Sequence, residues 1–215
     1  VEGIEPRFAD NYYDLIFELA TGLVSRGDAL LMIGVSGAQG TGKSTFAKML
    51  AIVFERVFSK RTLVMSLDDF YLTRAEREAL AAKVHPLLRT RGVPGTHDIG
   101  LLRKVIDDIR ARRNTRVPVF SKAEDDRHEM VPVMAGELDL LIVEGWCWGA
   151  LPSASRDLDT PINALEAKRD PDGSWRRYVN QQLAEGGYQE VFAEPDVLFF
   201  MAAPDMNAVI DWRWQ

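Results

Sequence analysis

The chain has 215 residues and a mass of 24.2 kDa, enough for one α/β domain with a full hydrophobic core. Hydrophobic residues make up 47% and charged residues 27%, which excludes disordered and collagen-like classes. With 26 basic and 32 acidic residues the net charge is −6, so we expect neither nucleic acid nor a membrane surface as a partner. The single cysteine, Cys147, cannot form an internal disulfide, which indicates a cytoplasmic location.

No segment of the sequence has the pattern of a membrane span or a signal peptide. The longest apolar runs, residues 30–35 and 197–203, are far shorter than the roughly 20 residues needed to cross a bilayer. The N-terminal segment is acidic, without the basic and apolar regions of a signal peptide. The chain starts at Val1 and stops at Gln215 inside a predicted helix, so we expect residues of a longer product to be missing at both ends.

Amphipathic and apolar segments alternate along the chain. Their spacing predicts a helix over residues 8–25, a strand at 30–35, a helix over 43–58 and a strand at 62–67. A helix over 100–112, a strand at 138–143, a helix over 174–188, a strand at 196–201 and a helix starting at 205 follow. The strands are short and almost continuously apolar, as in a parallel sheet buried on both faces. We therefore predict an α/β fold with a doubly wound, mainly parallel sheet and helices on both faces.

Two stretches, 84–98 and 151–173, are rich in turn residues and lack any period. Long irregular insertions in a compact domain more often contribute to function than serve only as connections. We expect them to be loops that contribute to function.

The strongest motif is Gly37-Ala-Gln-Gly-Thr-Gly-Lys-Ser44, which fits G-x-x-x-x-G-K-[ST] between a predicted strand and a predicted helix. Its glycines let backbone N–H groups surround phosphate, and the helix N-terminus adds partial positive charge. Lys43 would reach the β- and γ-phosphates of ATP, and the Ser44 hydroxyl would ligate Mg²⁺. The predicted nucleotide-binding residues are Gly37, Gly40, Thr41, Gly42, Lys43, Ser44 and Thr45.

Carboxylates follow two of the predicted strands. Asp68 and Asp69 come at the end of the strand at 62–67, where ligands bind in open α/β sheets. A carboxylate there can accept the proton of an attacking hydroxyl, although an aspartate at such a turn can also be a helix cap. Glu144 ends the apolar strand at 138–143 and is the second predicted Mg²⁺ residue after Ser44.

Several segments together resemble one kinase family: the phosphate loop, SLDDFY, RGVPGTHD, PVFSKAEDDR, VEGW and WRRYVN. They look like the plant-type D-glycerate 3-kinase family, within the wider phosphoribulokinase, uridine kinase and pantothenate kinase group. The resemblance runs from about residue 30 to the end and implies a single P-loop kinase domain over residues 1–215. It places the general base on Asp68 and a catalytic lid arginine on Arg213. The acceptor-binding residues that it implies are Tyr71, Arg91, His97, Asp98, Lys122 and Arg127.

We therefore expect an ATP-dependent kinase that transfers the γ-phosphoryl group to a hydroxyl of a small hydroxy acid such as D-glycerate, with a homodimer possible. Two alternatives stay open at this point. A nucleoside or pantothenate kinase would need an aromatic pocket, which Tyr71, Trp146, Trp148 and Tyr188 could supply, although such aromatics are more often core residues. A regulatory nucleotide-binding protein without kinase activity is the remoter alternative, and the sequence contains no N-K-x-D motif for guanine.

Overall fold

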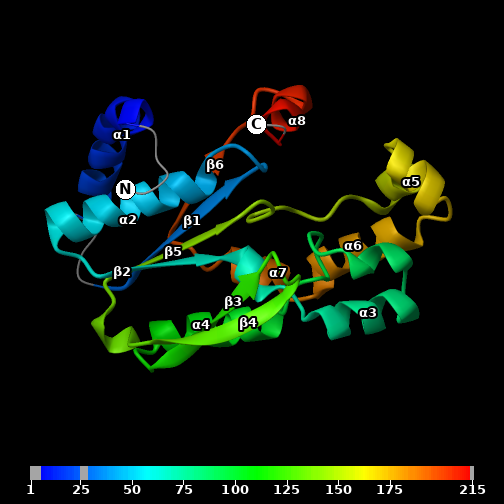
Figure 1. Ribbon diagram of the computed structural model, residues 1–215, viewed down its shortest axis with the longest axis horizontal. Helices are drawn as coiled ribbons and strands as arrows, with labels where there is room; N and C mark the ends of the chain where they lie inside the picture. The colour runs from blue at the N-terminus through cyan, green and yellow to red at the C-terminus, as the bar shows by residue number, and fades with distance from the viewer. Residues whose placement is uncertain (1–5, 25–28, 214–215) are drawn as a thin grey trace. The chain divides into compact units, whose positions relative to one another are not determined.

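The computed structural model describes residues 6–24 and 29–213, with side chains for 12–24 and 29–212 (Figure 1). The chain forms two compact units. The described parts of residues 1–66, 134–148 and 195–215 form the first unit, and residues 67–133 and 149–194 form the second. That residues 1–215 act as one kinase domain stays a prediction.

The first unit contains a four-stranded sheet in which every neighbouring pair is parallel. The order of its strands is β2 (Thr62–Ser66), β5 (Leu140–Gly145), β1 (Leu31–Gly37) and β6 (Val197–Met201). All four predicted strands are confirmed, with their ends shifted by three residues or fewer. Because the strands are parallel, the residues at their carboxyl ends lie along one edge of the sheet. The register places Val35 of β1 opposite Glu144 of β5 at this edge.

Helices pack on one face of this sheet. In Figure 1, α2 (Lys43–Phe58) runs along the strands and α1 (Pro6–Val24) packs on α2. The short α8 (Met206–Arg213) follows β6, and a 3₁₀ turn, η3 (Ala135–Glu137), precedes β5. The core on this face includes Ile16, Ile33, Leu50, Phe54 and Ile142.

The other face of the sheet is buried as well. Met32, Leu141 and Val143 point away from α2 along the alternating strands, and each is at most 1% exposed. Burial on both faces explains why β1 and β5 are almost continuously apolar, whereas Leu198 and Phe200 of the edge strand β6 are exposed. The predicted α/β class with a parallel sheet is confirmed.

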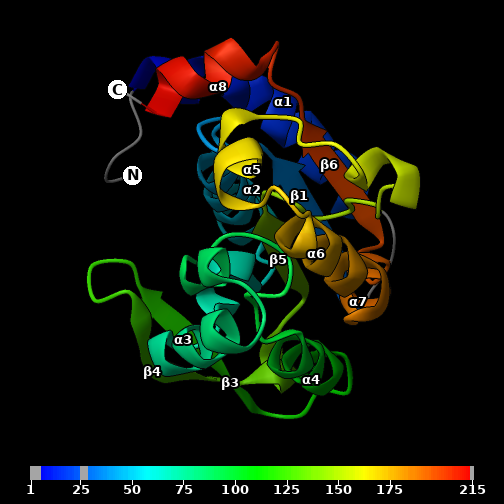
Figure 2. The same ribbon diagram turned by 90° about the vertical axis from the view of Figure 1, so that its right-hand side faces the viewer.

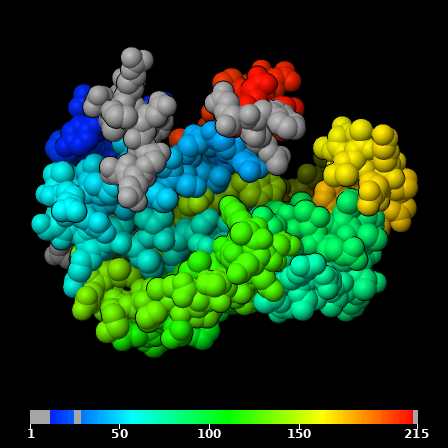
Figure 3. Space-filling view, viewed as in Figure 1, coloured from blue at the N-terminus to red at the C-terminus, as the bar shows by residue number. Residues whose placement is uncertain are grey.

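The second unit is built from short helices and one hairpin (Figure 2). Its helices are η1 (Leu67–Phe70), α3 (Arg74–Lys83), η2 (Pro86–Arg89), α4 (Ile99–Arg110), η4 (Ser155–Leu158), α5 (Ala164–Arg169), α6 (Ser174–Glu185) and α7 (Tyr188–Phe192). The antiparallel hairpin joins β3 (Thr115–Ser121) and β4 (Asp126–Val133). Half of the residues of β4 are exposed, and the strand appears green on the surface in Figure 3.

The predictions for this unit were less accurate. A single helix over 174–188 was wrong, because Gly187 adopts a left-handed φ of 83° and separates α6 from α7. The helix α3 and the β3–β4 hairpin were not predicted. The 151–173 segment is largely irregular, as expected, and is fixed by the buried Asp170, which accepts hydrogen bonds from Arg176 Nη1 (3.0 Å) and from the Trp175 N–H (2.8 Å).

Candidate active site

The phosphate loop connects β1 to α2 in the first unit. Gly40 and Gly42 adopt φ angles of 88° and 84°, the left-handed region that glycine tolerates without strain. Gly42 is the N-cap of α2, and no described side chain caps the helix there. The N–H groups of its first turn, which includes Lys43, Ser44 and Thr45, are therefore left for an anionic ligand, as at other phosphate-binding helix N-termini.

Close packing fixes the shape of this loop. A Cβ at Gly37 would lie 2.7 Å from Thr41 Oγ1 and 2.9 Å from the Met201 carbonyl oxygen, so only glycine fits. The Thr41 hydroxyl donates a hydrogen bond to the Ala38 carbonyl at 2.8 Å. A Cβ at Gly40 would lie 2.7 Å from Cβ of Trp212 in α8. Arg213 ends α8, and its side chain lies outside the described residues.

Ser44 and Glu144 are in direct contact. The Ser44 hydroxyl donates to Glu144 Oε1 at 2.9 Å, although the two residues are 100 positions apart in the sequence. Glu144 is 6% exposed, and its Oε2 is buried without a hydrogen-bond partner among the described residues. An unpaired buried carboxylate oxygen is costly, and a cation would satisfy it. One hydroxyl and one carboxylate fit Mg²⁺, which takes few protein ligands when phosphate oxygens complete its shell.

The second unit contains a cluster of charged residues around Asp68, which lies in η1 just after β2. Asp68 Oδ2 accepts a hydrogen bond from Lys122 Nζ at 2.8 Å, and Oδ1 accepts one from the Tyr71 hydroxyl at 3.0 Å. Burial by itself raises the pKa of Asp68, but the hydrogen bonds and the Lys122 charge outweigh it and hold the pKa below its usual value. Asp68 is therefore ionised at neutral pH.

Asp69 has a different environment from its neighbour. Its Oδ1 accepts a hydrogen bond from the Phe120 N–H at 3.2 Å. This bond ties η1 to β3, and it gives Asp69 a structural contact that does not involve Lys122 or Tyr71. Asp68 and Asp69 therefore have different partners, although they are adjacent in the sequence.

His97 lies against Tyr71 in the same cluster. A β-bridge pairs the two residues, and their rings stack with centroids 4.5 Å apart. His97 Nδ1 lies 2.9 Å from the hydroxyl oxygen of Tyr188, and the residue is 5% exposed. Burial lowers the pKa of His97 to about 3, against a smaller opposite effect of the Asp68 charge. The imidazole is therefore neutral at neutral pH.

The low pKa of His97 predicts that the protein loses stability in mild acid. The unfolded chain binds a proton at this residue near pH 6.5 and the folded chain only near pH 3. Stability therefore falls between these values as the pH is lowered, by up to about 1.4 kcal/mol per pH unit from this group. Urea unfolding at pH 7, 6 and 5 measures it, and the free energy of unfolding of His97→Gln should fall less steeply than that of the wild type.

His128, which is exposed, supplies the matched control. His128→Gln removes an exposed imidazole and leaves the buried one in place, so it should keep the wild-type pH slope. Equal slopes for His97→Gln and the wild type would contradict a buried neutral His97.

Arg127 connects this cluster to Asp98. Its Nη2 donates to the Tyr71 carbonyl at 3.1 Å and to Asp98 Oδ2 at 3.3 Å. The Arg127 Nε is buried and has no hydrogen-bond partner in the described part of the chain. Asp98 also caps α4, accepting from the Leu101 N–H at 2.9 Å. Tyr71, His97, Asp98, Lys122 and Arg127 thus lie in one network with Asp68.

Arg91 is held in a neighbouring cluster. Its guanidinium forms an ion pair with Asp125 and lies over the Phe120 ring, 5.4 Å from the centroid. Asp125 also binds the buried Arg77 at 3.1 Å. These contacts give Arg91 a carboxylate partner within the protein.

The contact between Tyr188 and His97 was not predicted. The sequence offered Tyr188 only as one of several aromatic residues that could line a pocket, and no local pattern links it to His97.

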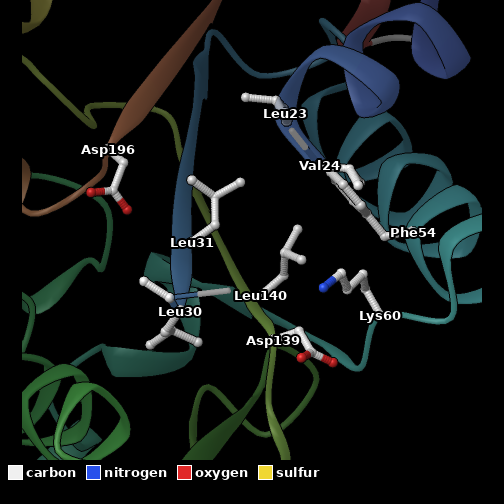
Figure 4. Close-up of a pocket in the computed structure, with 10 residues that line it drawn as sticks. Leu23, Val24, Leu30, Leu31, Phe54, Lys60, Asp139, Leu140 and Asp196 are labelled. Carbon is white, nitrogen blue, oxygen red and sulfur yellow. The ribbon is translucent and has the colours of Figure 1, made fainter. Parts of the chain in front are cut away.

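A separate cavity of about 230 Å³ lies at the opposite edge of the sheet (Figure 4). It is lined by Leu31 and Leu140, the first residues of β1 and β5, and by Asp196, which precedes β6. Asp196 Oδ2 accepts a hydrogen bond from the Met32 N–H at 2.8 Å. Ligands of open α/β sheets bind at the carboxyl ends of the strands, so this cavity is not the nucleotide site.

The described residues contain neither a metal-binding cluster of side chains nor a membrane-spanning helix. Over residues 6–24 and 29–213, no three or more His, Cys, Asp or Glu side chains converge as a metal-binding group. None of the helices described is long and apolar enough to cross a membrane. Cys147 is buried, as expected of a small apolar residue.

The parallel sheet and the glycine-rich loop between β1 and α2, with Glu144 at the end of β5, define a P-loop kinase. The sequence profile of the Phosphoribulokinase / Uridine kinase family matches residues 32–151, more than half of the chain. The chain belongs to this family, and it is an ATP-dependent small-molecule kinase.

Relatives within the family are similar over most of the chain. Uncharacterized kinase mug58 of Schizosaccharomyces pombe is 32% identical over 199 residues, covering 86% of this chain and 69% of that protein. The chloroplastic D-glycerate 3-kinase of Arabidopsis thaliana is 31% identical over 170 residues, covering 70% of this chain but 36% of that protein. The solved structure of D-glycerate 3-kinase from Cryptococcus neoformans has a TM-score of 0.76 and 26% identity, covering 98% of this chain and 78% of that one.

Proposed function

We propose that this kinase transfers the γ-phosphoryl group of ATP to a hydroxyl group of D-glycerate. The observation that carries the proposal is the network around Asp68, in which an ionised carboxylate is paired with Lys122, while Arg127 binds the Tyr71 carbonyl and Asp98 in the same network. A small hydroxy acid needs these groups: a base for its hydroxyl and cations for its carboxylate. The similarity to two D-glycerate 3-kinases supports the same acceptor.

The first unit supplies the groups that bind the nucleotide. The N–H groups at the start of α2 and the Lys43 ammonium bind the phosphates, and Lys43 neutralises the charge on the transferred group. Ser44 and Glu144 would hold Mg²⁺, which neutralises phosphate charge when it is bound. The unpaired Glu144 Oε2 supports this assignment. We further propose Arg213 as a cation for the transferred phosphoryl group.

Asp68 orients the acceptor and takes its proton. The acceptor hydroxyl donates a hydrogen bond to the Asp68 carboxylate, which orients the hydroxyl oxygen as the nucleophile. In the loose transition state of phosphoryl transfer the nucleophile needs positioning more than full deprotonation. A carboxylate with a lowered pKa is therefore adequate, and it remains ionised even in mild acid. The proton moves to Asp68 as the new O–P bond forms.

Recognition of the acceptor depends on charge. D-glycerate has few atoms, so its carboxylate must be bound by charge-assisted hydrogen bonds rather than by apolar contacts. The buried, unpartnered Nε of Arg127 is a donor available for that carboxylate, and the exposed Lys122 is a second cation. Asp98 holds Arg127 in place from the other side.

This binding mode predicts the result of a substitution and of a modified substrate. Arg127→Ala should raise the KM for D-glycerate by about 10- to 100-fold with the KM for ATP unchanged, because it removes a charged hydrogen bond worth roughly 1.5–3 kcal/mol. The methyl ester of D-glycerate should be a poor substrate of the wild-type enzyme. Steady-state kinetics with both substrates varied measures these effects. Arg74→Ala, which removes an exposed guanidinium of α3, is the control. An ester that reacts as well as the acid would contradict the assignment.

The acceptor itself is tested by a panel. ADP release with D-glycerate, L-glycerate, uridine, pantothenate and ribulose 5-phosphate, each against a blank without acceptor, should be fastest with D-glycerate. Faster turnover of uridine or pantothenate would favour the nucleoside or pantothenate kinase alternative. Equal ADP release with and without every acceptor would exclude all five compounds, D-glycerate included, as the acceptor. A cytoplasmic location and a homodimer stay predictions.

A further inference from the structure

One ring nitrogen of His97 has no partner in the described part of the chain. His97 Nε2 is buried and makes no hydrogen bond, whereas Nδ1 lies 2.9 Å from the Tyr188 hydroxyl oxygen. A buried polar atom without a partner is rare in proteins and is costly unless a ligand satisfies it. The Nε2 atom therefore indicates a contact with a bound molecule.

The hydrogen bonds of Tyr188 decide which ring nitrogen carries the hydrogen. The imidazole is neutral and has a single N–H, because burial disfavours the charged form. The Tyr188 hydroxyl oxygen accepts a hydrogen bond from the Gly95 N–H at 2.8 Å. A phenol oxygen shares electron density with its ring, so it accepts one hydrogen bond well and a second one poorly. Tyr188 therefore offers its own hydrogen to His97 Nδ1, which leaves the imidazole hydrogen on Nε2.

The backbone around Gly95 holds this arrangement in place. Gly95 has a φ of 95°, and a Cβ there would lie 2.8 Å from Tyr178 Cε1 and 2.9 Å from Gln182 Cγ. The direction of the Gly95 N–H is thus fixed by a turn that favours glycine and by close packing. On the other side of the imidazole, the stacked Tyr71 ring limits its rotation.

His97 lies in the same network as the proposed base. Tyr71 stacks on the His97 ring and donates its hydroxyl hydrogen to Asp68 Oδ1 at 3.0 Å. Tyr71 thus links the His97 ring directly to the carboxylate that we propose as the base.

We propose that the Tyr188 hydroxyl keeps the hydrogen of the neutral His97 imidazole on Nε2. This Nε2–H donates a hydrogen bond to an oxygen of the acceptor next to its reacting hydroxyl. The inference rests on the proposed function, and for D-glycerate the oxygen that accepts this bond is the 2-hydroxyl. Tyr188 is a positioning residue, because it acts through His97. Tyr188 and His97 together give the site an uncharged hydrogen-bond donor, the His97 Nε2–H, that recognises a hydroxyl of the acceptor.

The position of the hydrogen can be measured in the free protein. Nitrogen-15 NMR distinguishes the two neutral imidazole forms, and the chain has only three histidines, which single substitutions can assign. We expect His97 to carry its hydrogen on Nε2 in the wild type and to become a mixture of both forms in Tyr188→Phe. A wild-type hydrogen on Nδ1 overturns the proposal. This measurement needs no acceptor, so it decides the matter even if D-glycerate is not the substrate.

Kinetics test the contact with the acceptor. The analogue 3-hydroxypropanoate lacks the 2-hydroxyl, so the wild type should use it much less well than D-glycerate. Tyr188→Phe should lower kcat/KM for D-glycerate about tenfold, leaving the value for the analogue and the KM for ATP unchanged. Tyr178→Phe is the matched control: it removes a hydroxyl from another tyrosine beside Gly95 and should alter neither acceptor.

Each other outcome has a separate meaning. An equal loss of kcat/KM for both acceptors in Tyr188→Phe would reveal a merely structural role and overturn the proposal. No turnover of D-glycerate by the wild type would contradict the proposed function, and the NMR result would still stand. If Tyr188→Phe does not fold, His97→Gln and His97→Leu replace it. Gln keeps an N–H donor and should keep more of the preference for D-glycerate than Leu, and equal preferences would overturn the proposal.

Discussion

Asp68→Asn should lower kcat by roughly 10²–10⁴-fold, the usual contribution of a positioned general base. The amide has nearly the shape of the carboxylate and can still accept a hydrogen bond from Tyr71 or Lys122, so the fold and ATP binding should be retained. What is lost is the negative charge that orients the acceptor hydroxyl and takes its proton. Calorimetric titration with ATP and steady-state kinetics with D-glycerate separate the two effects.

Asp69→Asn is the matched control for this variant. Asp69 accepts a hydrogen bond from the Phe120 N–H, and an amide oxygen can accept the same bond. The kcat of Asp69→Asn should therefore stay within a few fold of the wild type. A larger loss in Asp69→Asn than in Asp68→Asn would show that the base is Asp69.

Lys43→Ala should abolish measurable phosphoryl transfer and weaken ATP binding. Lys43 is the side-chain cation that the phosphate loop directs at the β- and γ-phosphates, so its loss leaves the charge of the transferred group without that stabilisation. We expect kcat/KM to fall by about 10³-fold or more, since transition-state charge is stabilised most strongly at such positions. Calorimetry gives the ATP affinity, and a coupled ADP assay gives the rate.

Lys48→Ala, at an exposed position of the same helix, controls for the general loss of positive charge from α2. It should bind ATP and turn over like the wild type. Wild-type ATP affinity and turnover in Lys43→Ala would contradict the proposed role of the phosphate loop in ATP binding and phosphoryl transfer.

The sequence by itself determined the parallel sheet and the nucleotide-binding loop. Strands of a parallel sheet are mostly apolar, so β1, β2, β5 and β6 are visible as short, nearly continuous apolar runs. The phosphate loop is local: eight consecutive residues carry the glycines, the lysine and the hydroxyl that its chemistry needs. Such features depend on neighbours in the sequence and can be read without the fold.

Other features were hidden because their determinants are not local. In the β3–β4 hairpin, the first half of β4 is polar, and the strand has a single buried residue and contains a proline, so its apolar signal is weak. The break between α6 and α7 depends on the backbone conformation of Gly187, since Gly186 and Gly187 are otherwise tolerated within a predicted helix. In both cases tertiary packing decided what local propensity left open.

Only the tertiary structure gave the environments of the charged residues. The family resemblance placed the base on Asp68, but the different partners of Asp68 and Asp69, Lys122 and Phe120, are more than 50 residues away and are not visible in the local sequence. Arg91 and Arg127 each pair with a carboxylate, Asp125 and Asp98 respectively, but Arg127 also has a buried Nε without a hydrogen-bond partner among the described residues. The pairing of Tyr188 with His97 spans 91 residues. Hydrogen bonds and burial set the pKa and the available donors of a site, and both depend on contacts that form only when the chain folds.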